Sequence, residues 1–283
     1  MRTGYFRSIA VQGRLQRPPI WYKDAGLEPA PQFNKLSMSK KYKNKTCVYC
    51  MAANSSEDGD HVISREFFLP EKRADLPKVP ACKACNNAKA RLEHYLTAVM
   101  PFGGRHADSS RNLSTLVPPR LAKNTKLFAA LKQGMKSGIA RLSGGLWVPE
   151  MTVPIDSERL IELFELIARG LAYWHWGIYL PANTCVVKAA FLTSPGRAMF
   201  EKLLAQNAKN RIKGNLGDGV FTYEGAQSTE CPELTVWRMS LYGVVVGNDP
   251  RSPTERCSEA YCLTALRRMP AANELVRLLA GTT

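Results

Sequence analysis

Two pairs of cysteines most constrain the fold of this 283-residue chain. Cys47 and Cys50 form one C-x-x-C pair, and 31 residues separate it from a second pair, Cys82 and Cys85. Each pair can turn tightly and offer two thiolates, and four thiolates suit a tetrahedral Zn²⁺ ion. A redox C-x-x-C would need a βαβ context and only one pair. The sequence therefore predicts a structural zinc, which would contribute about 10–16 kcal/mol to folding of the segment.

The remaining composition indicates a globular protein outside the membrane. Hydrophobic residues make up 45% of the chain, but no apolar run approaches the roughly 18 residues that span a bilayer. The first 20 residues lack the continuous apolar core of a signal peptide. We therefore expect a cytoplasmic protein with no membrane partner. Its other cysteines are then expected to be buried or free thiols.

The net charge of +15 indicates a polyanionic partner, and nucleic acid is the commonest one. The first 120 residues hold 20 Lys and Arg against 10 Asp and Glu, so the half with the cysteine pairs is the more basic one. DNA is the expected partner, and RNA is not excluded. A merely soluble basic protein is the simpler alternative that charge alone leaves open.

The chain divides into four segments by composition. Residues 1–45 contain several prolines and end in "KKYKNK", so we expect an irregular basic arm that either contacts DNA or carries little structure. Residues 46–100 carry the cysteine pairs. Residues 101–119, "PFGGRHADSSRNLSTLVPP", are rich in Gly, Ser and Pro and are typical of a linker. Residues 120–283 are expected to form an α+β domain.

Apolar spacing within 120–283 predicts the elements of that domain. Helices are expected over about 120–142, from Asp156 or Ser157 to Gly177, near 196–208 and near 271–280. Strands are expected from Thr184 and within "GVFTYEGA" and "ELTVWRMSLYGVVVG", which would form a small antiparallel sheet. Four lysines largely fall off the apolar stripe of the helix expected over 120–142: Lys123, Lys126, Lys132 and Lys136. A solvated basic face is their simpler interpretation, and a face that contacts phosphates is the alternative.

A zinc site alone does not explain the residues between and after the pairs. "CVYC", "GDHVIS" and "CKACNNAK" occur in that order over residues 47–95, and they resemble the HNH endonucleases that carry a zinc. The resemblance implies a ββα-metal fold, with the Asp-His dipeptide on one strand and the Asn at the start of the following helix. The overall fold class expected is therefore α+β, with this module followed by the C-terminal domain.

The resemblance also implies catalytic roles. His61 would be the general base that activates water, and Asp60 and Asn86 would hold a catalytic divalent cation, Mg²⁺ or Mn²⁺. An unperturbed histidine has a pKa suited to this proton transfer, and carboxylate and amide oxygens suit Mg²⁺. Adjacent residues on a strand point to opposite faces, however, so Asp60 and His61 can serve one site only at a bulge or a strand edge.

Nearby cations are candidates for contacts with nucleic acid: Arg65, Lys83 and Lys89, the last on the same helix face as Asn86. A solvated helix lysine is the alternative interpretation of Lys89. Two positions depart from the family pattern. Pro77 stands where a middle Asn is frequent, and a backbone carbonyl would have to replace that side chain. Ser64 stands where a proline is frequent after "DHVI".

The function expected from these residues is a metal-dependent endonuclease that hydrolyses phosphodiester bonds in DNA, in phage defence or a mobile element. The alternative is a zinc-stabilised nucleic-acid-binding module without catalysis, which would not need His61. A zinc-bearing interaction protein without a nucleic-acid role is a third interpretation. Two symmetric cuts would suggest a dimer, and the C-terminal domain is a candidate for contacts with a second copy or a partner protein.

Overall fold

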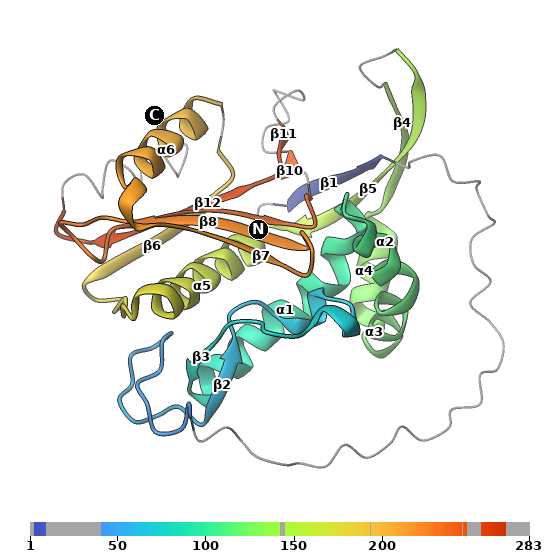
Figure 1. Ribbon diagram of the computed structural model, residues 1–283. Helices are drawn as coiled ribbons and strands as arrows, with labels where there is room; N and C mark the ends of the chain where they lie inside the picture. Colours follow the sequence, from blue (N-terminus) through green and yellow to red (C-terminus); the bar gives the residue numbers. More distant parts are fainter. Residues whose placement is uncertain are drawn as a thin grey trace.

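The computed structural model describes residues 3–9, 41–141, 145–192, 194–244, 246–247 and 256–269 (Figure 1). The helix expected near 271–280 and most of the expected N-terminal arm lie outside the described residues. Among the described helices, none combines the length and apolar character that crossing a bilayer requires.

The cysteine-bearing segment folds as two short strands followed by a long helix. Strands β2 (Asp58–His61) and β3 (Lys78–Ala81) pair antiparallel, with His61 opposite Lys78. The short 3-10 helices η1 (Arg65–Phe67) and η2 (Pro70–Lys72) lie between them, and helix α1 (Lys83–Gly103) follows β3. Asn86 therefore lies in the first turn of a helix, as expected.

The prediction of a linker over residues 101–119 is wrong. Helix α1 continues to Gly103, and helices α2 (Ala107–Thr115) and α3 (Val117–Lys123) follow at once. The polar residues of this stretch serve packing: the buried Asn112 amide donates to the Phe67 carbonyl at 3.0 Å and to the Tyr242 hydroxyl at 2.7 Å. Gly104 allows a close approach, since a Cβ there would lie 2.4 Å from the Cβ of Ser109.

A five-stranded antiparallel sheet has the order β11-β10-β1-β5-β4. It includes residues for which the sequence predicted a helix, over 120–142, and an irregular arm, over 1–45, so both predictions are wrong in part. The expected helix over 120–142 divides into the end of α3, helix α4 (Thr125–Gly134) and strand β4 (Lys136–Arg141), which pairs with β5 (Trp147–Asp156). Part of the expected irregular arm is strand β1 (Thr3–Ile9), paired along its length with β5. Strands β10 (Val246–Gly247) and β11 (Arg256–Cys257) complete the sheet.

A second antiparallel sheet confirms the expected α+β character of the C-terminal half. Its order is β6-β12-β9-β8-β7, and its strands are β6 (Cys185–Ala190), β7 (Arg211–Leu216), β8 (Phe221–Gln227), β9 (Thr235–Leu241) and β12 (Ala260–Leu266). Helices α5 (Ser157–Trp176) and α6 (Ser194–Gln206) lie on its two sides (Figure 1). The 3-10 helix η3 (Ala208–Asn210) leads into β7.

Helix α5 begins and ends as predicted. The Asp156 side chain caps it by accepting from the Arg159 N–H at 3.2 Å, and Gly177 ends it with a φ of 67°. This helix packs against both the second sheet and α1. A Cβ at Gly170 would lie 2.8 Å from Val62, directly after β2. One apolar core therefore continues from the cysteine-bearing segment to the C-terminal sheet.

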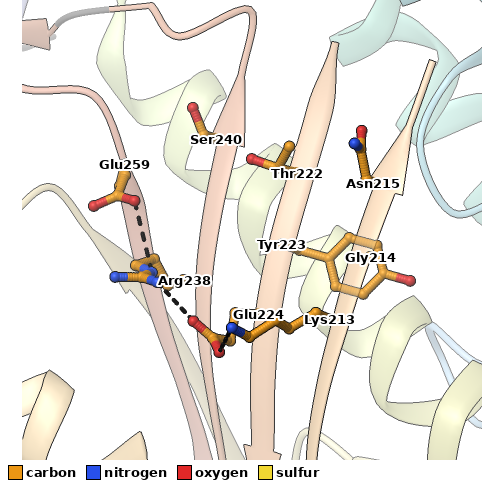
Figure 2. A pocket seen from close by; sticks show the side chains of 9 residues that line it. All are labelled: Lys213, Gly214, Asn215, Thr222, Tyr223, Glu224, Arg238, Ser240 and Glu259. Atoms are coloured by element: carbon orange, nitrogen blue, oxygen red, sulfur yellow. Dashed lines mark hydrogen bonds and ion pairs between the residues drawn. The ribbon is translucent and has the colours of Figure 1, made fainter. Parts of the chain in front are cut away.

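A polar hollow of about 360 Å³ lies on strands β7, β8 and β9 (Figure 2). The buried Glu224 carboxylate accepts from Arg211, lies 2.6 Å from Arg238 Nη2 and 3.4 Å from Lys213 Nζ. Arg238 also pairs with Glu201 at 2.7 Å. Because these charges neutralise one another, we assign the hollow to sheet stability and assign no ligand to it.

Replacing Glu224 by Gln should lower the free energy of unfolding at neutral pH by about 1.5–3 kcal/mol, the range for hydrogen bonds to charged groups. Burial raises the pKa of Glu224, but Arg211, Arg238 and Lys213 outweigh burial and hold the pKa below its ordinary 4.5. The carboxylate therefore contributes fully above pH 4.5 and less as the pH falls through its folded value. Urea unfolding of both proteins across this range should show the difference shrinking in acid; a constant difference would contradict the assignment.

Candidate functional site

The four cysteines of the two C-x-x-C pairs converge, as the sequence predicted. Their Sγ atoms all lie within 4.8 Å of one another, and Cys50 Sγ is 3.7 Å from Cys82 Sγ. Thiolates about 2.3 Å from a tetrahedral zinc lie about 3.8 Å apart. The donor set therefore fits a structural metal such as zinc.

Local backbone geometry presents each pair. Cys47 and Cys50 lie on a tight turn, in which the Met51 N–H donates to the Cys47 carbonyl at 2.9 Å. The backbone of Met51 is left-handed there, with a φ of 66°. Cys82 caps α1, and its Sγ accepts from the Cys85 N–H at 3.5 Å. Burial raises the pKa of Cys47 and Cys85. At Cys82 the hydrogen bonds from Cys85 and the neighbouring thiols outweigh burial and lower the pKa.

Beside the cysteines, Lys89 forms the centre of a buried charged cluster. Only 1% of Lys89 is exposed. Its Nζ lies 3.0 Å from Asp60 Oδ2 and 2.6 Å from Glu93 Oε1, and it donates to the His61 carbonyl at 2.6 Å. Asp60 also accepts from the Tyr49 hydroxyl at 2.6 Å. We call Tyr49, Asp60, Lys89 and Glu93 the buried lysine cluster.

The pKa shifts in this cluster follow from desolvation. Burial raises the pKa of Glu93, against the lowering effect of the Lys89 ammonium. Burial, then the charge of Asp60, raises the pKa of Tyr49 well above its ordinary value. The Tyr49 hydroxyl therefore stays protonated and remains a donor to Asp60. Each charged group of the cluster has an oppositely charged partner within 3.0 Å, as buried charges require.

The prediction that Lys89 contacts a phosphate is wrong, because its ammonium is enclosed by Asp60, Glu93 and the His61 carbonyl and does not reach solvent. The other two predicted contacts keep accessible side chains. Arg65 has 61% of its side chain exposed and lies 3.5 Å from Glu66. Lys83 is exposed at the first residue of α1.

His61 lies half-buried at the end of β2, with its backbone held on both sides. Its carbonyl accepts from Lys89, and the next N–H, of Val62, donates to the Pro77 carbonyl at 2.8 Å. Burial, then the charge of Lys78, lowers the pKa of His61 to about 4, with Asp60 opposing the shift. The imidazole is therefore neutral near pH 7, the state in which it can accept a proton.

Asp60 and His61 do not share a face. Asp60 is 7% exposed and points to the buried lysine cluster, and His61 follows it on a regular strand. Asn86 is half-buried, and within residues 41–141 no hydrogen bond joins its side chain to either of them. This arrangement does not fit a divalent cation at Asp60, since the Lys89 ammonium already lies 3.0 Å from that carboxylate and would repel it.

Sequence reasoning missed two residues near His61. Tyr49 lies inside the first C-x-x-C pair, and its hydroxyl donates to Asp60. Lys78 lies opposite His61 across the hairpin. The pairing of Glu93 with Lys89 was also missed, although the i, i+4 spacing of opposite charges is a sequence signal for it.

No protein-family model, curated protein or solved structure matches this chain, so its function is inferred from the residues themselves.

The purified protein should contain one zinc per chain, bound by the four clustered cysteines. Replacing Cys50 by Ser removes one thiolate and should cause loss of zinc and unfolding of the cysteine-bearing segment. The matched control is Cys231→Ser, which lies outside the cluster and should keep the metal. Elemental analysis after dialysis measures both; equal zinc in the two variants would refute the assignment.

Replacing Lys89 by Met should lower the free energy of unfolding by about 3–5 kcal/mol, because it leaves buried carboxylates without their cation. Adding Asp60→Asn to that variant removes one of the uncompensated charges and should recover part of the loss. Denaturant unfolding of the two single variants and the double variant gives the coupling energy. Additive losses would show that the two charges do not interact.

Proposed function

We propose that residues 46–103 form a zinc-bearing HNH endonuclease module that hydrolyses phosphodiester bonds in DNA. The observation that carries the proposal is the placement of His61. A neutral, half-buried imidazole lies at the end of a strand whose backbone is fixed on both sides, in the same segment as the four-cysteine cluster. The strand–strand–helix order of the segment supports the resemblance that its motifs suggest.

The chemistry assigned to this chain begins with proton transfer. His61 takes a proton from water, the water oxygen forms a bond to phosphorus, and the bond from phosphorus to the leaving oxygen breaks. Negative charge grows on the phosphate during this displacement and must be stabilised. Lys78 is opposite His61, and Arg65 is close enough to lower the histidine pKa, so both supply positive charge near the base. No step is assigned to a cation at Asp60.

A nucleic-acid-binding module without catalysis is the second candidate. The engagement of Asp60 with Lys89 and Tyr49 favours it, because that carboxylate is then a structural group rather than a metal ligand. Under this proposal the zinc and the exposed cations suffice, and His61 contributes nothing beyond packing.

Cleavage of plasmid DNA by matched histidine variants separates the two candidates. The wild type and His94→Ala, a change at an exposed histidine of α1, should cut DNA at similar rates. His61→Ala should cut roughly 100-fold more slowly or worse, the usual loss when a general base is removed. The reactions are run with EDTA, with Mg²⁺ and with Mn²⁺, and RNA is tested in parallel.

Equal cleavage by wild type and His61→Ala would exclude His61 as the base. No cleavage by any protein, together with salt-sensitive DNA binding by all three, would favour the second candidate. A strict need for Mg²⁺ or Mn²⁺ would show that Asp60 leaves Lys89 in the active complex or that the cation binds elsewhere.

A further inference from the structure

One stretch of the chain carries positive charge without any negative charge. Between Asp108 and Glu150 the sequence has no Asp or Glu and seven basic residues. They are Arg111, Arg120, Lys123, Lys126, Lys132, Lys136 and Arg141. Its described residues form most of α2, all of α3, α4 and β4, and the start of β5, which lie together at one end of the molecule (Figure 1).

Five of these seven basic residues fall into two groups. Arg111 and Arg120 are paired, with Glu71 at 2.9 Å and Glu66 at 2.8 Å. In contrast, Lys123, Lys126 and Lys132 are exposed, and no acidic side chain within the described residues pairs with them. Their charge is therefore available to an external partner.

The same stretch also exposes large apolar side chains. Of five exposed large hydrophobic residues in the described part of the chain, four fall between residues 128 and 147. They are Phe128 at 51%, Ile139 at 70%, Leu146 at 70% and Trp147 at 66% exposed. Trp147 pairs with position 141, two residues beyond Ile139, so Trp147 and Ile139 share one face of the hairpin.

The stretch is anchored firmly to the rest of the molecule. Arg120 donates to the carbonyls of Thr97 and Glu66 as well as to the Glu66 carboxylate. A Cβ at Gly134 would lie 2.6 Å from Pro154, so α4 packs closely on β5. Helices α3 and α4, which carry the exposed lysines, are therefore held in place relative to the HNH-like segment.

We propose that this basic hairpin surface, defined by Lys123, Lys126, Phe128, Lys132 and Trp147, binds a single-stranded segment of nucleic acid. The lysines contact phosphates and the aromatic rings stack on unpaired bases, the combination that typifies single-strand binding. A duplex offers phosphates but keeps its bases stacked inside the helix, so those bases could not stack on the exposed rings. The proposal stands apart from the proposed cleavage, since it needs no catalysis.

Fluorescence anisotropy with a dye-labelled oligothymidylate of about 20 nucleotides tests the surface. The full-length His61→Ala protein is used, so that cleavage cannot affect the signal. Lys126→Glu with Lys132→Glu should weaken binding about tenfold or more and reduce the salt dependence of log K by about 1.4, the value for two phosphate contacts on a single strand. The control is Lys202→Glu with Lys209→Glu, which changes the net charge equally at two exposed lysines of α6 and η3 and should bind like the parent.

Trp147→Ala should weaken binding about five- to 140-fold with no change in salt dependence, because it removes stacking and leaves the charges. Each variant is first compared with the parent by thermal unfolding. If the variant with Lys126→Glu and Lys132→Glu does not fold, the variant with Lys126→Gln and Lys132→Gln replaces it.

Equal weakening of binding in the two double lysine-to-glutamate variants would overturn the proposal, since net charge alone would then explain binding. Tighter binding to the matched duplex, unaffected by Trp147→Ala, would also overturn it. Binding to anionic phospholipid vesicles in preference to oligothymidylate would identify a membrane surface instead. Oligouridylate run in parallel distinguishes RNA from DNA as the source of the strand.

Discussion

The burial of one ammonium group organises the cysteine-bearing half of the molecule. Lys89 is 1% exposed, and a charge removed from water must be compensated on every side. Asp60 comes to it from β2, Glu93 from the next turn of α1, and the His61 carbonyl completes the shell. Strand and helix are therefore locked in one relative position. Zinc binding at the cysteines would join the turn before β2 to the start of α1.

This cluster also explains which site residues could be predicted from sequence. The spacing of the cysteines was sufficient, because ligand geometry leaves few arrangements for two C-x-x-C pairs. The roles of Asp60 and Lys89 could not be predicted, because both depend on which face of β2 is buried. Alternation along a strand places neighbouring residues on opposite faces, and only tertiary packing decides that Asp60 points inward and His61 does not.

The errors in the fold have a common physical origin. Polar and small residues in "PFGGRHADSSRNLSTLVPP" are typical of linkers, yet they act here through buried hydrogen bonds, such as those of Asn112 to Phe67 and Tyr242. Strand β1 pairs with β5, about 150 residues away in the chain. Such long-range pairing leaves no local signal. Helix α5, by contrast, carries its own caps and apolar stripe, and its bounds could be predicted.

The two proposed surfaces would place different demands on the fold. A general base would need a fixed position, and the backbone at His61 has one because its carbonyl and the Val62 N–H are both bonded. A bound single strand would need accessible charge and rings, and the basic hairpin surface exposes both. Arg120 joins α3 to the cysteine-bearing segment, because it bonds Glu66 in the 3-10 helix that begins four residues after His61. The helix that ends at Lys123 is therefore held at a constant position relative to the strand that ends at His61.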